Sequence, residues 1–216
     1  MKKLLLGSQA TDSAPRAAPV GSDVSSEAVR AADVVPGVEA FYEQQVQRCN
    51  DRGVAAETLR LSHVAVRTRT WRDYLQQRDE LERHCVANIE NVWNGRPISK
   101  LLLAEPIPLG GAWLELVELI PPFHQRVYRM GLEHLGFVVG DDLEDFSKRH
   151  RPVLTGQQFQ SPENEPVYIL FEDYTHVKFH RHSLREACER EGRSFDRFQH
   201  SDWNVEHELA GPYALS

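Results

Sequence analysis

The chain contains 216 residues with a formal net charge of −7, and 41% of its residues are hydrophobic, 26% charged and 9% aromatic. This composition is typical of a globular protein, and the length allows one domain with tails or two small modules that share a core. The acidic balance and the scattered arginines argue against a nucleic-acid-binding protein, and no stretch approaches the ~20 apolar residues that span a bilayer.

The cysteines and the start of the chain bear on where the protein works. Cys49, Cys85 and Cys188 lie far apart and form no Cys-x-x-Cys pair, so we expect reduced thiols rather than a disulfide framework or a zinc ribbon. The apolar run after Met1 ends at Leu6, which makes it shorter than the ~7 to 15 residues of a secretory signal. We therefore expect a cytoplasmic protein that binds neither membranes nor nucleic acid.

Residues 1–34 are predicted to be a disordered lead, because they are rich in Ala, Ser, Pro, Gly and Asp and show no repeating apolar face. Apolar residues then recur at helical spacing up to a stop at Gly53, which predicts an added N-terminal helix whose apolar stripe packs on the core. The stripe consists of Val38, Phe41, Tyr42, Val46 and Cys49.

The next segment predicts a β-α-β-β-β unit, module one, over about residues 61–121. An alternating run over 61–68 is typical of a strand, and a capping signal at Thr70 opens a helix. Turn signals rich in Gly and Pro separate three further strands. We expect these strands at 86–93, 96–105 and 112–120, with turns at 94–95 and 106–111.

The same order of elements recurs over about residues 131–191, module two. A strand over 132–139 precedes a helix that Asp142 is expected to cap. Ser183 begins a capping box for a closing helix, and residues 192–216 form a polar tail that we expect to be partly ordered. Further strands are predicted at 153–159, 167–172 and 176–180, of which the first is the least distinct.

The two units predict an α+β fold of paired βαβββ modules, whose leading histidines, His63 and His134, stand 71 positions apart. In the first strand, Val64 and Val66 lie on one face, while His63 and Arg67 lie on the other. Burying Arg67 in an apolar interior would be costly, so a curved sheet around a polar or metal-bearing cup is favoured.

Other strands also carry polar groups where an apolar sheet would not. The last strand of module two directs His176, Lys178 and His180 to one face, and a solvated edge strand is the alternative explanation. Glu115 and Glu118 interrupt the apolar strand over residues 112–120, where carboxylates are costly unless they are partnered.

A metal site follows if the modules pack as pseudo-twofold partners. His63 and His134 would then reach equivalent places around one axis, and Glu118 could complete a set of three ligands. Two imidazoles and one carboxylate leave coordination positions open, and the same set suits iron, zinc, manganese or nickel.

Five stretches of the chain together resemble the YecM family, which belongs to the vicinal oxygen chelate superfamily with glyoxalase I, bleomycin-resistance proteins and extradiol dioxygenases. The resemblance covers residues 35–191 and implies paired modules that form a cupped mixed sheet around a divalent metal. It implies His63, Glu118 and His134 as the ligands, with Glu115 as the alternative to Glu118. The stretches are SHVAVR at 62–67, NGRPI at 94–98, VEL at 117–119, LEH at 132–134 and VKFH at 177–180.

The resemblance further implies a divalent-metal-dependent enzyme that applies Lewis-acid chemistry to a small, oxygen-rich, chelating and anionic molecule. Lys178 stands where metal enzymes of the superfamily often place a carboxylate, and an ammonium there does not bind a metal. Lys178 is therefore a candidate catalytic residue, and Arg67 on the polar face of the first strand is another. Arg96 and His180 are candidate substrate-binding residues. Arg96 has a competing structural role in its turn, and His180 or His176 is an alternative fourth ligand.

Glu133 is a candidate for orienting a ligand imidazole through a hydrogen bond. Two other functions stay open, namely a binder that sequesters a small molecule in the same cup and a domain that serves mainly as an interaction partner. The set of His63, Glu118 and His134 separates an enzyme from both, because a mere binder would not require it. The reaction type and the oligomeric state are not determined by these residues.

Overall fold

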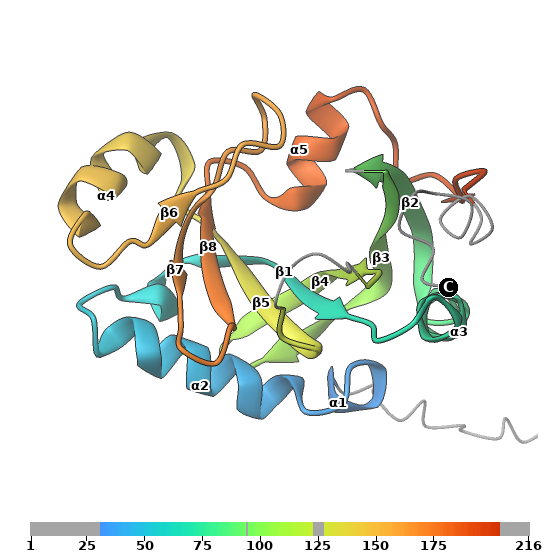
Figure 1. The fold of residues 1–216 in the computed structure, drawn as a ribbon, viewed down its shortest axis with the longest axis horizontal. Coiled ribbons are helices and arrows are strands. Elements are labelled where there is room, and N and C mark those ends of the chain that lie inside the picture. The colour runs from blue at the N-terminus through green and yellow to red at the C-terminus, as the bar shows by residue number, and fades with distance from the viewer. Residues whose placement is uncertain (1–30, 94, 123–127, 204–216) are drawn as a thin grey trace, which may run out of the picture.

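The computed structural model describes residues 31–93, 95–122 and 128–203, which form one nine-stranded mixed sheet flanked by helices (Figure 1). The strands follow the spatial order β6-β7-β8-β5-β1-β4-β3-β2-β9. Their bounds are β1 Arg60–Arg67, β2 Cys85–Trp93, β3 Arg96–Leu109, β4 Ala112–Ile120, β5 Gly131–Val138, β6 Gly156–Gln157, β7 Val167–Leu170, β8 His176–His180 and β9 Phe198–Gln199.

The helices cover both sides of this sheet. The long helix α2 packs against β5 and β8, and α3 packs against β2, β3 and β4. The closing helix α5 contacts β1 and lies on the other side of the strands from α2 (Figure 1). The bounds are α1 Ala31–Val34, α2 Val38–Asn50, α3 Trp71–Glu82, α4 Leu143–His150 and α5 Leu184–Arg190, with 3-10 turns at Ala56–Thr58 and Gly140–Asp142.

The sheet contains the predicted duplication. Module one has the strand order β1-β4-β3-β2 and module two has the matching order β5-β8-β7-β6, each beginning with a parallel pair. The two modules join through antiparallel β1 and β5, where His63 pairs with Gly136 and Ala65 pairs with His134. A shift of 71 residues converts one pair into the other, so the two modules are related by a pseudo-twofold axis between β1 and β5.

Local signals place most of these elements. Thr70 caps α3 by accepting a hydrogen bond from the backbone of Asp73, and Ser183 forms the full capping box with Glu186 at α5. Asp142 occupies the N-cap position of α4, as expected, although its side chain makes no capping hydrogen bond and a 3-10 turn precedes the helix.

Three segments differ from the prediction. Residues 31–34 of the expected lead form α1 and bury Val34, while the rest of the lead lies outside the described residues. The strand expected over 153–159 shortens to β6. β3 continues through the turn expected at 106–111 as far as Leu109. Pro106 and Pro108 are tolerated there because the pairing of β3 with β2 ends at Leu103, which leaves that edge free.

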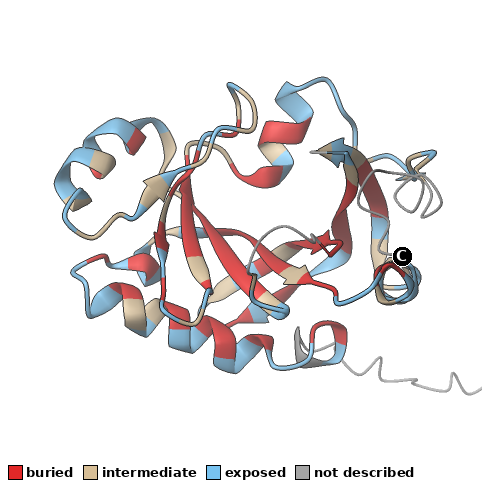
Figure 2. Ribbon diagram, viewed as in Figure 1, coloured by how far each residue is buried: buried red, intermediate tan, exposed pale blue. Residues whose placement is uncertain are grey.

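The main apolar core lies between the sheet and α2, and Figure 2 shows buried residues concentrated on the central strands and on the sheet-facing side of α2. Val64 and Val66 belong to this core, as the alternation of β1 predicts. The opposite face of the sheet therefore carries His63 and Arg67. None of the described helices combines the length and the apolar character needed to cross a membrane.

The turn between β3 and β4 gives a stability prediction. Gly110 has a φ of 54°, and a Cβ added there would lie 2.6 Å from a ring carbon of Tyr42, whereas Gly111 has a φ of 90° with no atom within 4 Å. We expect Gly111→Ala to cost about 1 to 2 kcal/mol for its left-handed backbone, and Gly110→Ala to cost more because the Tyr42 ring must also move. Urea unfolding of both variants checks this order, and equal losses would contradict it.

Candidate metal centre and cavity

Three side chains from three adjacent strands converge on the face of the sheet opposite α2. His63 of β1, Glu118 of β4 and His134 of β5, the candidate ligand trio, are all buried, and each offers an atom that could bind a metal within 4.8 Å of the others. His63 Nε2 lies 3.3 Å from His134 Nε2 and 3.7 Å from Glu118 Oε2, and His134 Nε2 lies 3.2 Å from the same carboxylate oxygen.

This spacing fits a divalent metal ion. Bonds of about 2.0 to 2.2 Å to nitrogen and oxygen, at tetrahedral or octahedral angles, place neighbouring ligand atoms about 3 to 3.5 Å apart. Two of the three distances in the trio lie in this range, and the third, at 3.7 Å, lies just above it. Neutral imidazoles and one carboxylate are also the donors that such an ion binds.

The position of each histidine depends on a β-bulge. The pairing of β1 with β5 shifts register between Leu61 and His63, and again opposite His134, so that Ser62 and Glu133 are the extra residues. The two bulges are related by the same 71-residue shift as the histidines. A bulge breaks the alternation of side chains, which allows the residue before each histidine to approach the same imidazole.

These two residues fix the orientation of the two imidazoles. Ser62 Oγ lies 2.9 Å from His63 Nδ1 and accepts a hydrogen bond from the backbone of Leu184, and Glu133 Oε1 lies 3.3 Å from His134 Nδ1. With the Nδ1 atoms engaged as donors, the Nε2 atoms face one another as acceptors.

Glu133 is held in turn by Arg67. The Arg67 guanidinium makes a bidentate ion pair with the Glu133 carboxylate, donates to the carbonyl of Pro121 at 2.9 Å, and lies 3.8 Å from the centre of the Tyr128 ring. These contacts give Arg67 a positioning role: it orients Glu133, which orients His134.

Burial and neighbouring charges set the protonation of the cluster. Burial lowers the pKa of the His63 imidazole to about 3, which favours the neutral, metal-binding form. Burial opposes ionisation of Glu118, but the contact with His134 and the positive charge of neighbouring groups such as Lys178 hold the pKa of its carboxyl well below the usual value. Burial likewise opposes ionisation of Glu133, which the hydrogen bond from His134 and the charge of Arg67 overcome, giving a pKa of about 2.

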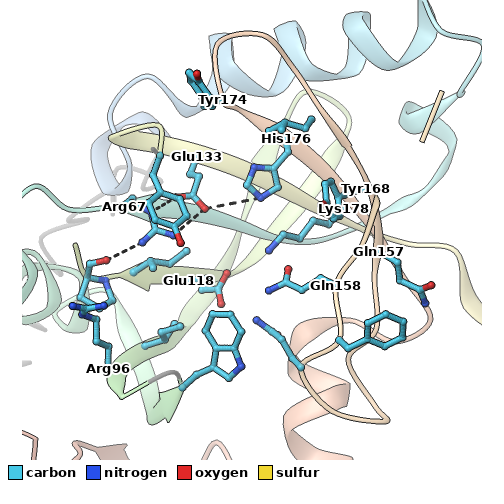
Figure 3. A pocket seen from close by; sticks show the side chains of 18 residues that line it. Arg67, Arg96, Glu118, Glu133, Gln157, Gln158, Tyr168, Tyr174, His176 and Lys178 are labelled. Carbon is cyan, nitrogen blue, oxygen red and sulfur yellow. Dashed lines mark hydrogen bonds and ion pairs between the residues drawn. The ribbon is translucent and has the colours of Figure 1, made fainter. Parts of the chain in front are cut away.

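A cavity of about 510 Å³ opens beside the trio, a size within the range of small-molecule sites. Glu118 is the member of the trio that lines it, and Figure 3 shows Glu118 facing the interior with Lys178 directed toward it. Arg67, Glu133 and His176 form one wall (Figure 3).

The structure places the other predicted residues as follows. Arg96 and Lys178 line the cavity, and burial lowers the pKa of the Lys178 ammonium. His180 is buried beside His63, with ring centres 5.4 Å apart, and does not line the cavity. His176 lines the cavity and forms a second cluster with Glu133 and His134. Glu115 belongs to neither cluster among the described residues.

Sequence reasoning missed two residues of this site, Ser62 and Gly136. A Cβ added to Gly136 would lie within 2.6 Å of His63 Nδ1, so only glycine leaves room for that imidazole. Ser62 had a signal, because it precedes the leading histidine as Glu133 does in module two. The need for Gly136 follows from its place opposite His63, which only the strand register shows.

Comparisons with known proteins place this site in a family. Residues 31–173 match the model of the YecM protein family. Protein YecM of Escherichia coli strain K12 is 27% identical over 180 residues, which cover 74% of this chain and 93% of that protein.

The chain is also similar to solved structures, of which the first shares its fold. The structure described as Structural Genomics, Protein EC4020 has a TM-score of 0.58 and 21% identity, and the match covers 76% of this chain and 99% of that one. The fosfomycin resistance protein FosX of Listeria monocytogenes, complexed with Mn(II) and a sulfate ion, is 13% identical with a TM-score of 0.25; the match covers 61% of this chain and 96% of FosX.

The paired bulges generate a prediction about metal affinity. Glu133→Gln removes a charged partner of His134 and is expected to weaken metal binding about 10- to 100-fold. Ser62→Ala removes a neutral partner of His63 and should weaken it less. Competition with a chromogenic chelator measures both affinities. A larger loss for Ser62→Ala would contradict the assigned roles, and melting temperatures of both metal-free variants control for a general loss of stability.

A second prediction concerns the space beside His63. Gly136→Ala forces the imidazole away from the trio, so metal affinity should fall by about tenfold or more. Gly156→Ala is the matched control, because the added methyl group would press on Tyr168 in the cavity wall and leave the trio untouched. Equal metal affinities of the two variants would rule out this role for Gly136.

Proposed function

The chain belongs to the YecM family and has the vicinal oxygen chelate fold, and from this premise we propose that it is a divalent-metal-dependent enzyme that acts on a small oxygen-rich anion in the cavity. The observation that carries the proposal is the convergence of two imidazole nitrogens and one carboxylate oxygen at distances of 3.2 to 3.7 Å. His63, Glu118 and His134 hold the ion, which is iron, zinc, manganese or nickel.

The bound ion would supply Lewis-acid polarisation to two substrate oxygens. Two imidazoles and one carboxylate carry a single negative charge, so a divalent ion leaves the centre positive and attractive to an anion. Three protein ligands would leave coordination positions for a substrate, and Glu118 is the member of the trio that lines the cavity.

The chain's own groups bind and orient the substrate. Lys178 and Arg96 add positive charge to the cavity wall. Arg67 acts through Glu133 rather than on the substrate, because Glu133, Pro121 and the Tyr128 ring already occupy its guanidinium. Burial lowers the pKa of the His176 imidazole well below its usual value, so His176 is a neutral hydrogen-bonding group and a weak base at the cavity wall.

Metal analysis tests the proposal. Protein purified without chelator should contain about one equivalent of a divalent metal, and His63→Ala and His134→Ala should lose it, with affinities more than about a hundredfold lower because a direct ligand is removed. Glu115→Gln, on the strand that carries Glu118, and His150→Ala, on α4, are matched controls that should retain the metal. Elemental analysis of all five proteins provides the measurement.

Two outcomes would contradict it. Metal-free wild-type protein that binds small anions in calorimetry would indicate sequestration without a metal. Wild type and variants with equal metal content would place the ion elsewhere. Circular dichroism of each variant separates loss of the metal from loss of the fold.

A further inference from the structure

Lys178 occupies the place in module two that Glu118 occupies in module one. In module one, β4 places Glu118 beside Ala65, and in module two, β8 places Lys178 beside Gly136. Ala65 and Gly136 are equivalent, because each lies two residues after the leading histidine of its module. The pseudo-twofold axis therefore relates a carboxylate that can bind a metal to an ammonium that repels one.

The Lys178 ammonium is nearly buried and has no direct partner among the described residues. Only 9% of the residue is exposed, and the side chain lines the cavity and points to its interior (Figure 3). Within the described part of the chain its nitrogen has neither a hydrogen-bond acceptor nor an ion-pair partner, whereas the neighbouring cation Arg67 is paired with Glu133. The carboxylates of Glu118 and Glu133 attract this ammonium, but neither makes an ion pair with it. A buried charge without a direct partner is costly, so this position favours an anion from outside the chain.

The mouth of the cavity is lined by apolar and aromatic side chains, unlike the charged interior around Lys178. Phe159, Leu170 and Tyr174 line it and are 69%, 44% and 49% exposed, and Trp93 and Tyr128 line it as well. A cavity of about 510 Å³ has room for a ligand larger than a simple diacid. Its end away from Lys178 therefore meets apolar and aromatic side chains.

We infer that the ligand is a carboxylate with a hydroxyl or oxo group on the adjacent carbon and an apolar substituent beyond it. The two oxygen functions fit the open coordination positions next to Glu118, and the carboxylate pairs with Lys178. The ligand carboxylate thus supplies a further oxygen donor, because the position equivalent to Glu118 in module two holds Lys178 instead of a carboxylate. This inference rests on the proposed metal-dependent function and adds the chemical class of the substrate.

Calorimetry with Co(II)-loaded protein tests it, using mandelate and 1-phenyl-1,2-ethanediol as probes. The two probes share the phenyl group and the adjacent hydroxyl, and differ in that a neutral CH₂OH replaces the carboxylate. We expect mandelate to bind wild type and to bind Lys178→Met about 10- to 100-fold more weakly, the size of a lost charge-assisted hydrogen bond. Binding of the diol should be weak and the same in both proteins.

Two further variants sharpen the experiment. Lys148→Met, which removes an exposed lysine of α4, should bind mandelate as wild type does. Lys178→Glu restores a carboxylate at the symmetric position, so it should hold Co(II) more tightly and lose mandelate. The visible absorption of Co(II) reports both the metal and chelation by the ligand.

The outcomes distinguish the two proposals. Wild type that takes up no Co(II) would overturn the metal-dependent function and this inference with it. Stoichiometric Co(II) together with equal mandelate affinity in wild type and Lys178→Met, or with no mandelate binding, would overturn the inference alone. Diol binding as tight as mandelate binding to wild type would also overturn it.

Discussion

The antiparallel pairing of β1 with β5, with one bulge on each strand, is the constraint on which the site depends. It joins the two modules and sets their pseudo-twofold axis. It brings His63 and His134 to 3.3 Å of each other although 71 residues separate them in the chain. Because each bulge adds one unpaired residue, Ser62 and Glu133 reach the imidazoles from neighbouring positions. A one-residue slip of this register would place the two histidines on opposite faces of the sheet, with one of them toward the apolar core.

The two faces of the sheet have opposite energetic roles. The face toward α2 is a continuous apolar core that stabilises the fold. The other face buries Glu118, Glu133, Arg67 and Lys178 together with the histidines, and desolvating such charges costs stability unless they are paired. Arg67 and Glu133 satisfy each other. Glu118 and Lys178 both line the cavity, so a bound ligand could compensate their charges, as expected of a functional site.

The two modules differ in the residues they place at equivalent positions of the site, so the site is not symmetric. Equivalent positions hold Ser62 and Glu133, and also Glu118 and Lys178. Module one therefore supplies a neutral orienting group and an anionic ligand, whereas module two supplies an anionic orienting group and a cation. A strictly symmetric site would surround the ion with four protein ligands and leave less room for a substrate. In the proposed metal site, the broken symmetry would leave one side of the ion open to the cavity.

The amino-acid sequence by itself determined the order of elements in both modules, the helix caps at Thr70 and Ser183, and the polar face that carries His63. These features depend on alternation and helical periodicity, which are local properties of the chain. Only the tertiary structure decided the register of β1 against β5, the need for glycine at residue 136, the pairing of Arg67 with Glu133 and the equivalence of Lys178 with Glu118. Each of these is a contact between segments far apart in the chain, and the geometry of such a contact is set by bulges and strand register that no local pattern encodes.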